Sequence, residues 1–441
     1  MLKRKAMAFL EKWKESSDKK SLLISGARQV GKTYIVRRFA EANYSSFIEL
    51  NFLENNSLSD IFSGALDAQS ILTNIRLVLP RQKIIPGETL LFLDEIQECP
   101  QAVTALKFLT QEKAIDVIAS GSALGIAYKQ AASFPVGAVD YLDMTSLDFE
   151  EFLWALQVDK EVIDTIKTYY VQKKPVPQSI HRKMMEYLRQ YMVIGGMPEA
   201  VQKFTDTQSY MEADTVLRNI YRAYITDIAH YASPDIKIKA EKCYRSIPLQ
   251  LTKDNHKFQY KTVEAKGTAR KFESSIDWLV NAYMAYPVYN VSAVEYPMKS
   301  FRKEDNFRLY MNDIGLLVST YDYELKNVLL HDGAVEEKAD NLILRVAKGG
   351  LYEALAADIL LKSGKELSFF RNDAGTIELE FFFESADGII PVEIKAGRNS
   401  SASLNRILEQ DSVPYGYKLS SQNVGISGKK ITLPLYMIMF L

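Results

Sequence analysis

A short glycine-rich segment carries the clearest chemical signal in the sequence. Residues 26–33 read GARQVGKT, which fits the spacing G-x-x-x-x-G-K-[ST] directly after the apolar run SLLIS. The two glycines permit backbone conformations that turn successive N–H groups towards a phosphate, and the helix expected next adds the positive end of its dipole. Lys32 can neutralise β- and γ-phosphate oxygens, and the Thr33 hydroxyl can reach Mg²⁺. We expect the nucleotide to contact Gly26, Ala27, Arg28, Gln29, Val30, Gly31, Lys32, Thr33 and Tyr34.

Two adjacent carboxylates end a second apolar run. Residues 90–95 read LLFLDE, the pattern of a buried strand that brings its last side chains to the phosphate end of a sheet. Asp94 can hold Mg²⁺ together with Thr33, and Glu95 can polarise the water that attacks the γ-phosphate. A glutamate beside the Mg²⁺ aspartate is typical of hydrolysing ATPases more than of switch GTPases. We therefore expect Glu95 to be the catalytic residue, with ATP or ADP and Mg²⁺ as the bound groups.

A further strand candidate ends in serines. The run IDVIAS at 115–120 continues into Gly121 and Ser122. A polar side chain at the end of a strand lying between the P-loop strand and the Asp94 strand can contact the γ-phosphate or the attacking water, and Ser120 or Ser122 could do so. Serine and glycine are also ordinary turn residues after a strand. Both interpretations stay open at this point.

The scaffold for these side chains is a repeated alternation of strands and helices. Continuous apolar runs separated by helix-like stretches predict a parallel sheet covered on both faces, the α/β architecture of P-loop nucleotide-binding domains. The runs lie at 21–25, 46–52, 89–94, 115–120 and 139–144.

Composition narrows the class of protein. A chain of 441 residues predicts about three domains. The chain has 54 Lys and Arg against 55 Asp and Glu. This near-neutral balance argues against a protein whose whole surface attracts nucleic acid. Two cysteines and four scattered histidines exclude a disulfide scaffold and argue against a zinc site. No apolar run approaches the ~18 residues that a membrane span needs, and the first residues do not form a signal-peptide pattern. We expect a cytoplasmic protein with no membrane partner.

Four segments follow from the patterning along the chain. Residues 1–150 form the predicted ATPase domain, and 151–235 read as a helical connector. In 236–328, helices are followed by strand-like residues, an order that resembles a winged helix-turn-helix. In 329–441, a helix precedes three strand candidates, including IELEFFFES and IIPVEIKAG.

These motifs in this order resemble the prokaryotic AAA-family ATPases that carry a C-terminal domain of unknown function. The resemblance rests on LLISGARQVGKT, LLFLDEIQ, IASGS and SLDFEEFL, and it continues in the later blocks YMVIGGMPEAV, LYMNDIGLL and IIPVEIKAG. It implies ATP binding at residues 26–33, Mg²⁺ at Thr33 and Asp94, and hydrolysis by Glu95. Relatives often place a basic residue where this chain has Ala138, after the glycine of FPVG. If that side chain helps to stabilise the γ-phosphate, hydrolysis here is slow or uses Arg28, Arg37 or an arginine from a partner subunit.

A basic stretch lies at 236–271. It holds ten Lys and Arg against three acids, and clustered cations on a winged helix suit contacts with a nucleic-acid backbone. A solvated basic face or a docking surface for acidic parts of the same chain fits equally. Arg270 and Lys271, which open the helix-like run RKFESSIDWLVNAY, are the residues that we expect to contact DNA.

The last segment carries a possible nuclease signature. Glu353 on a helix, Glu380 on one strand and the pair Glu393 and Lys395 on the next resemble the restriction-endonuclease-like core of the PD-(D/E)xK type, in which acids converge on Mg²⁺ and a lysine positions water. In VEIK, alternation directs Glu393 and Lys395 to one face. An alternating strand with an exposed Glu/Lys pair is the other interpretation. The family's first carboxylate is commonly an aspartate, which puts the activity in doubt.

The sequence thus predicts a Mg²⁺-dependent ATPase that converts ATP to ADP and phosphate and uses the reaction as a conformational switch. The ATPase could also be linked to DNA through residues 236–271. Two alternatives stay open: an ATP-gated nuclease or defence enzyme, and a non-hydrolysing switch that holds ADP and recruits a protein partner. A homo-oligomer is compatible with each of them.

Overall fold

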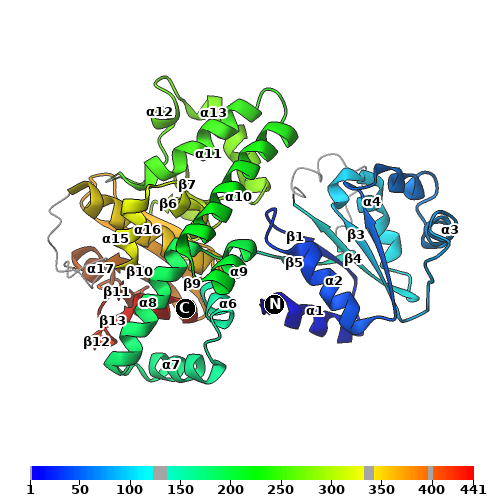
Figure 1. The fold of residues 1–441 in the computed structure, drawn as a ribbon. Helices are drawn as coiled ribbons and strands as arrows, with labels where there is room; N and C mark the ends of the chain where they lie inside the picture. The colour runs from blue at the N-terminus through cyan, green and yellow to red at the C-terminus, as the bar shows by residue number, and fades with distance from the viewer. Residues whose placement is uncertain (1, 123–136, 254, 332–341, 396–400) are drawn as a thin grey trace. The chain divides into compact units, whose positions relative to one another are not determined.

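The computed structural model describes residues 2–122, 137–253, 255–331, 342–395 and 401–441. Its contacts group the chain into two compact units, each with its own sheet (Figure 1). The N-terminal unit comprises residues 3–146 and 278–284, and the C-terminal unit comprises 147–277 and 285–441. The segments expected at 151–235, 236–328 and 329–441 therefore lie together in one unit, apart from residues 278–284.

The N-terminal unit is built on a parallel sheet of five strands in the order β2-β3-β4-β1-β5. Every apolar run predicted as a strand forms one. β4 lies between β1 and β3, as expected for the strand that ends in Ser120. The strands are β1 (Ser21–Ser25), β2 (Ser46–Asn51), β3 (Thr89–Asp94), β4 (Ile115–Gly121) and β5 (Val139–Asp143).

Helices cover both faces of this sheet. All six residues of β3 are buried, which requires apolar cover above and below. On one face, Leu23 and Leu91 share a core cluster with side chains of α3 and α4. The helices of this unit are α1 (Lys5–Glu15), α2 (Lys32–Asn43), α3 (Ala68–Val78) and α4 (Pro100–Leu109), with 3₁₀ turns at Asn56–Phe62 and Ile96–Glu98.

The C-terminal unit begins with the helices predicted after residue 148. The first of them starts at a capping box, in which the Asp148 carboxylate accepts from the Glu151 N–H and the Glu151 carboxylate accepts from the Asp148 N–H. α13 starts in this unit, and its last residues, from Trp278, belong to the N-terminal unit. The helices are α6 (Phe149–Ala155), α7 (Lys160–Gln172), α8 (Gln178–Ile194), α9 (Pro198–Thr207), α10 (Tyr210–Tyr231), α11 (Lys237–Leu251), α12 (Tyr260–Val263), α13 (Ala269–Asn281), α14 (Ile314–Ser319), α15 (Tyr323–Leu330), α16 (Leu342–Lys362) and α17 (Ala402–Ile407).

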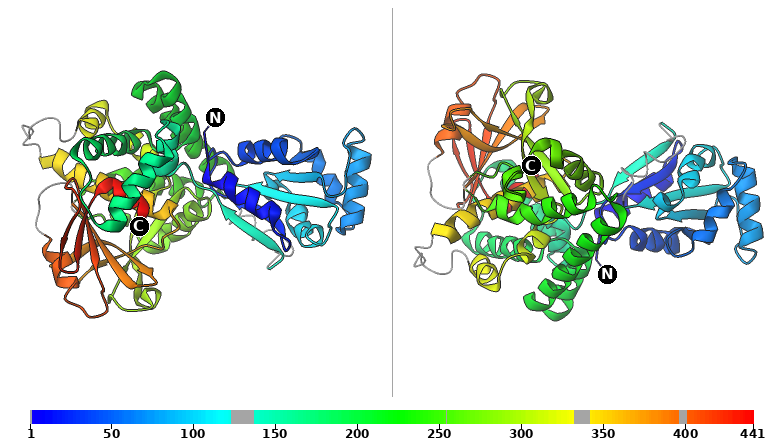
Figure 2. Two further views of the ribbon diagram at one scale, coloured as in Figure 1. Left: turned by 90° about the horizontal axis from the view of Figure 1, so that it is seen from below. Right: turned by 90° about the horizontal axis from the view of Figure 1, so that it is seen from above.

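One mixed sheet of eight strands, in the order β12-β13-β11-β10-β9-β8-β6-β7, runs through this unit. The hairpin of β6 and β7, expected as the ribbon of a winged helix, continues this sheet because β6 pairs in parallel with β8. Figure 2 shows the remaining strands beside it in orange and red. The strands are β6 (Ala285–Val291), β7 (Arg302–Met311), β8 (Ser368–Arg371), β9 (Glu378–Ser385), β10 (Gly388–Lys395), β11 (Gly416–Ser420), β12 (Gly425–Ser427) and β13 (Lys430–Pro434), with 3₁₀ turns at Met298–Phe301 and Leu435–Phe440.

A buried ion cluster joins α8, α14 and α16. Lys362 Nζ lies 3.0 Å from Asp313 Oδ2 and 2.9 Å from Asp358 Oδ1. Tyr191 donates its hydroxyl hydrogen to Asp358 Oδ2 at 2.8 Å, and Asp313 Oδ1 accepts from the Gly315 N–H at the start of α14. Because its cation and both acids have partners, the cluster avoids the cost of an uncompensated buried charge.

The glycine pair of the block YMVIGGMPEAV borders this cluster. Leu147 donates its N–H to the Gly196 carbonyl at 2.7 Å, and the Gly196 N–H donates to Asp313 Oδ2 at 2.8 Å. A Cβ atom on Gly196 would lie 1.9 Å from the Leu147 carbonyl oxygen. Only glycine permits this close approach of two backbones, which anchors the first residue of the C-terminal unit.

None of the helices in the described ranges combines the length and the hydropathy that crossing a bilayer requires.

Candidate functional site

The loop between β1 and α2 has the backbone of a phosphate cradle. Gly26 and Gly31 have φ angles of 147° and 95°, which other residues rarely adopt. A Cβ atom on Gly26 would lie 2.0 Å from the backbone oxygen of Met144. The first N–H groups of α2, which starts at Lys32, have no partners within the helix and point their positive dipole end into the loop.

Lys32 closes the loop on itself. Its ammonium group donates to the carbonyl oxygens of Gly26 at 2.9 Å and Ala27 at 2.8 Å, and the side chain is buried. Burial lowers the pKa of Lys32 to about 8, although Glu95 and Asp94 oppose this shift. A phosphate would offer this desolvated cation an anionic partner in place of two neutral carbonyls.

Asp94 gathers neutral donors at the end of β3. Its Oδ2 accepts from Thr33 Oγ1 at 2.9 Å and from Asn51 Nδ2 at 3.2 Å, and its Oδ1 accepts from Ser120 Oγ. Burial raises the pKa of Asp94, these hydroxyl donors lower it, and nearby Glu95 raises it further. The predicted residues Thr33, Asp94 and Ser120 therefore meet at one point, where a cation would relieve the charge of two acids.

Glu95 follows in a left-handed conformation with φ of 52°. Its Oε2 accepts from Gln97 Nε2 at 2.5 Å and from Ser122 Oγ at 3.5 Å. The structure thus divides the two serines, with Ser120 on Asp94 and Ser122 beside Glu95.

Tyr34 and Arg37, two further residues considered for nucleotide contact, are both exposed. Tyr34 is half exposed, and the Arg38 guanidinium lies 5.6 Å from its ring. Arg37, one of the arginines considered for the γ-phosphate, makes two bonds of 2.9 and 2.7 Å with Glu49. Of the segment FPVGA, residues 134–136 lie outside the described residues.

The donors at this site fit Mg²⁺ with a nucleotide. Mg²⁺ is held in such sites by one or two protein oxygens, by phosphate oxygens and by water, and the Thr33 hydroxyl and Asp94 carboxylate supply the protein oxygens. In the described ranges, no group of three or more His, Cys, Asp or Glu is placed to hold a metal by itself.

Sequence reasoning missed Asn51 and Gln97. Asn51 ends β2 and pairs in register with Asp94. This polar residue near the end of the run 46–52 could therefore have been predicted to lie at the site. Gln97 reaches Glu95 only because the chain turns at Ile96–Glu98, and no pattern in the sequence indicates that bond.

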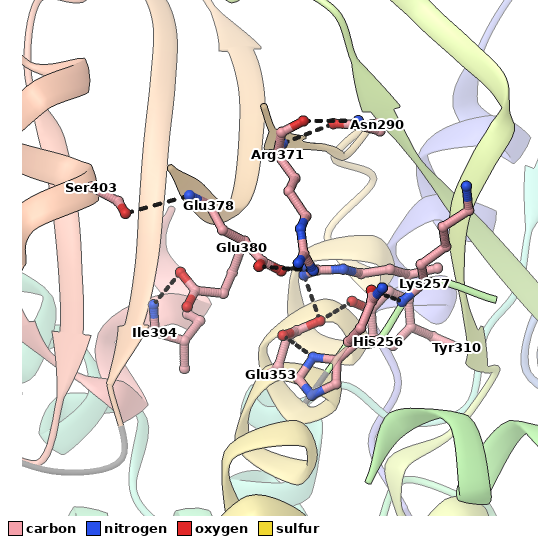
Figure 3. Close-up of polar contacts among 12 residues, drawn as sticks. His256, Lys257, Asn290, Tyr310, Glu353, Arg371, Glu378, Glu380, Ile394 and Ser403 are labelled. Carbon is pink, nitrogen blue, oxygen red and sulfur yellow. Dashed lines mark hydrogen bonds and ion pairs between the residues drawn. The ribbon is translucent and has the colours of Figure 1, made fainter. Parts of the chain in front are cut away.

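Glu353, expected in the C-terminal acidic site, is enclosed by hydrogen-bond donors (Figure 3). Its Oε1 accepts from Arg308 NH1 at 2.8 Å and from the Tyr310 hydroxyl, and its Oε2 lies 2.6 Å from His256 Nδ1. Burial alone would raise the pKa of Glu353, but Arg308 and His256 lower it to about 2. Arg308 also forms an ion pair with Glu378.

Glu380, Glu393 and Lys395 do lie together. Lys395 Nζ is 3.3 Å from Glu380 Oε1 and 3.5 Å from Glu393 Oε1, while the buried Glu393 Oε2 has no partner among the described residues. Burial raises the pKa of Glu380 to about 7, against the attraction of Lys395. Lys395 lies between these two carboxylates and offsets part of their charge.

The two cations proposed for DNA differ in their surroundings. Arg270 is exposed, whereas Lys271 is ion-paired with Glu264, which also binds Lys242 at 3.1 Å. Part of the positive excess at 236–271 is thus neutralised locally.

Comparisons with known proteins agree with the nucleotide site. Residues 18–153 match the family model described as "AAA domain". Residues 185–326 match "Domain of unknown function (DUF8612)", and residues 348–436 match "Domain of unknown function (DUF4143)". No curated protein matches the chain.

Two solved structures show a distant likeness. The Walker-type ATPase PABY2304 of Pyrococcus abyssi is 12% identical, with 73% of this chain and 95% of that chain covered and a TM-score of 0.44. The ORC1 protein of Aeropyrum pernix, solved in complex with DNA, is 12% identical, with 76% and 93% covered and a TM-score of 0.30. At these TM-scores the likeness carries no argument for a shared function. The assignment rests on the family match and the P-loop geometry, and the chain carries an AAA-type ATPase domain at residues 18–153.

Proposed function

We propose that the protein is a Mg²⁺-dependent ATPase that hydrolyses ATP to ADP and phosphate. The observation that carries this proposal is the hydrogen bond between Thr33 Oγ1 and Asp94 Oδ2, 2.9 Å long. It brings the two oxygen groups that suit Mg²⁺ to the mouth of a glycine loop that also holds Lys32. No other described part of the chain combines a phosphate cradle, a desolvated cation and a carboxylate next to a candidate base.

Each side chain has a distinct role in this proposal. Lys32 exchanges the carbonyls of Gly26 and Ala27 for β- and γ-phosphate oxygens. Thr33 and Asp94 hold Mg²⁺, which neutralises charge on the phosphates when bound. Glu95 leaves Gln97 and orients the attacking water.

We also propose that the nucleotide state acts as a conformational switch. Within the N-terminal unit, the Met144 N–H donates to the Ser25 carbonyl at 2.7 Å, and the Met144 backbone touches Gly26 of the P-loop. Leu147, three residues later, is anchored on Gly196 in the C-terminal unit. A movement of the P-loop on nucleotide binding would thus be passed along residues 144–147 to Leu147, which is anchored on Gly196.

A second candidate is a switch that holds ADP without turnover. It is favoured by the 2.5 Å bond between Gln97 Nε2 and Glu95 Oε2, which keeps the candidate base engaged. Such a protein would retain ADP tightly and recruit a protein partner.

Measurement of phosphate release and nucleotide binding separates these functions. We expect Lys32→Ala to abolish ATP binding and Glu95→Gln to keep binding but stop release. Release that continues unchanged in Glu95→Gln would remove Glu95 from its role. Copurified ADP together with no release by the wild-type protein would establish the second candidate.

A further inference from the structure

A pocket of about 530 Å³ lies in the C-terminal unit. Neither the ion cluster around Lys362 nor the acidic residues Glu353 and Glu380 line it. Its walls come from α10, α11 and the segment that follows α14, so all of its residues fall within the range 185–326 that matches a domain of unknown function. The polar groups on these walls are Arg218, Arg222, Arg245, Thr252, Ser319 and Thr320.

All the charged residues that line this pocket are positive. Three arginines line it and no acidic residue does. A second pocket of about 440 Å³ in the same unit is instead balanced, because Glu186 and Asp214 line it together with Arg189 and Lys326. Asp214 and Glu241, which do not line the pocket, pair with two of the three guanidinium groups, so a bound anion would chiefly add a partner for Arg222.

Two of the arginines are oriented by bonds that leave most of their donors free for a ligand. Arg218 uses Nε on Asp214 at 2.9 Å and NH2 on the Tyr321 carbonyl at 3.0 Å. Arg245 uses Nε on Glu241 at 2.8 Å. A guanidinium group has five N–H donors in a fixed plane. These bonds hold each plane in place, so a ligand would lose less side-chain entropy on binding.

Arg222 has no such bond. It lies one helical turn after Arg218 on α10, it is exposed, and in the described ranges its guanidinium has no hydrogen-bond or ion-pair partner. The positive charge of Arg222 is thus available to a bound anion.

The walls that carry the arginines are held together. The Tyr321 hydroxyl donates to the Pro248 carbonyl at 2.8 Å, which fixes the segment after α14 against α11. The Tyr221 ring of α10 stacks on Tyr244 of α11, with centroids 5.6 Å apart. These contacts fix the walls of the pocket relative to one another, as in the largely preformed sites that bind small ligands.

We propose that this pocket binds phosphate groups, supplied by the backbone of a nucleic acid. Arginine is the side chain whose planar fork matches phosphate oxygens in pairs. The hydroxyls of Thr252, Ser319 and Thr320 already donate to backbone carbonyls, so the arginines supply the donors for a phosphate. Phosphate contacts of this kind position a nucleic acid without reading its sequence. This site goes beyond the proposed ATPase function and does not depend on it. It also places the nucleic-acid contact away from Lys271, whose charge Glu264 neutralises.

The test uses the full chain carrying Lys32→Ala, which removes the other phosphate site. Anisotropy of a labelled DNA duplex is titrated without nucleotide at about 50 and about 200 mM salt. We expect Arg222→Glu to weaken binding about tenfold at low salt and to reduce the salt slope by about one to two. Arg222→Lys should retain most of the affinity. Arg222 is exposed and unpaired in the described structure, so these changes should leave the fold intact, which circular dichroism checks.

Arg182→Glu is the matched control. Arg182 is an exposed arginine of α8 outside the pocket, and its reversal changes the net charge by the same amount. A second arm replaces DNA with inorganic pyrophosphate, measured by calorimetry. Binding of pyrophosphate but not of DNA, lost in Arg222→Glu alone, would assign the pocket to a free phosphate compound. If neither ligand distinguishes Arg222→Glu from Arg182→Glu, the proposal is wrong.

Discussion

Thr33 Oγ1 donates a hydrogen bond to Asp94 Oδ2 at 2.9 Å, although 61 residues separate them. The bond ties the first turn of α2 to the end of β3, so the P-loop and the acidic pair form one site before any nucleotide arrives. Thr33 and Asp94 would hold Mg²⁺, which would offset the charge of the phosphates.

Asp94→Asn should make nucleotide binding insensitive to Mg²⁺. The amide keeps the shape and the contacts with Thr33 and Asn51 but loses the charge that a hard cation needs. We expect affinity for ATP with Mg²⁺ to fall about tenfold and affinity in EDTA to remain equal or to rise, as measured with a fluorescent ATP analogue. Asp116→Asn, at the start of neighbouring β4, serves as the control. An unchanged response to Mg²⁺ in Asp94→Asn would contradict the assignment.

Ser120, near the end of β4, and Ser122, just after it, should differ in effect. Ser120 bonds directly to Asp94, and loss of a hydrogen bond to a charged group costs about 1.5–3 kcal/mol. Ser120→Ala should therefore reduce kcat/KM for ATP about tenfold or more. Ser122 contacts Glu95 only at 3.5 Å, so Ser122→Ala should reduce kcat less than about threefold. A larger loss in Ser122→Ala would mean that Ser122 contacts the attacking water.

Much of the N-terminal site follows from local patterns. Thr33, Asp94 and Ser120 could be placed together because the carboxyl ends of parallel strands meet at one edge of a sheet. Gln97 could not, because its contact with Glu95 depends on a turn whose backbone conformation the residue types do not indicate.

The C-terminal unit shows where such reasoning fails. The strands carrying Glu380, Glu393 and Lys395 were predictable from alternation. The partners of Glu353 were not, since Arg308 lies on β7 and His256 lies in a loop after α11. These contacts join residues 45 and 97 positions apart in the chain, and only the packing of β7 against α16 brings them together.

Glu380 should make stability depend on pH. Burial raises the pKa of Glu380 from 4.5 to about 7, so the folded protein binds this proton more tightly than the unfolded chain. The resulting stabilisation is present at low pH and is lost as pH rises from 4.5 to about 7. Glu380→Gln lacks this titration. Its free energy of unfolding should gain about 1–3 kcal/mol relative to wild type between about pH 5 and pH 8. The difference in unfolding free energy between Glu380→Gln and wild type is measured by denaturant titration at each pH. If that difference is the same at every pH, the expectation is wrong.

DNA cleavage should be absent. Arg308, Tyr310 and His256 enclose Glu353, and Lys395 already neutralises Glu380. Plasmid DNA incubated with the protein, Mg²⁺ and ATP should therefore remain supercoiled on agarose gels, for the wild type and for Lys395→Ala alike. Nicking by the wild type that disappears in Lys395→Ala would establish the nuclease alternative instead.

Gly196→Ala should destabilise the C-terminal unit. A Cβ atom there would lie 1.9 Å from the Leu147 carbonyl oxygen, and backbone on both sides would have to separate. We expect a loss of about 2–4 kcal/mol in the free energy of unfolding. Gly349→Ala is the matched control, because that glycine lies within α16 and an added Cβ atom meets nothing within 4 Å. The control should gain about 0.5–1 kcal/mol from helix propensity.

The same variant tests the proposed switch. If the anchor of Leu147 transmits the nucleotide state, loosening it should leave ATP affinity in the N-terminal unit unchanged but remove any ATP-dependent change in protease cleavage of the C-terminal unit. Cleavage is measured well below the lowered Tm of Gly196→Ala, so that unfolding of the variant does not contribute to it. An ATP-dependent cleavage pattern equal to that of Gly349→Ala would show that the signal passes by another route, such as α13, whose residues from Trp278 onward belong to the N-terminal unit.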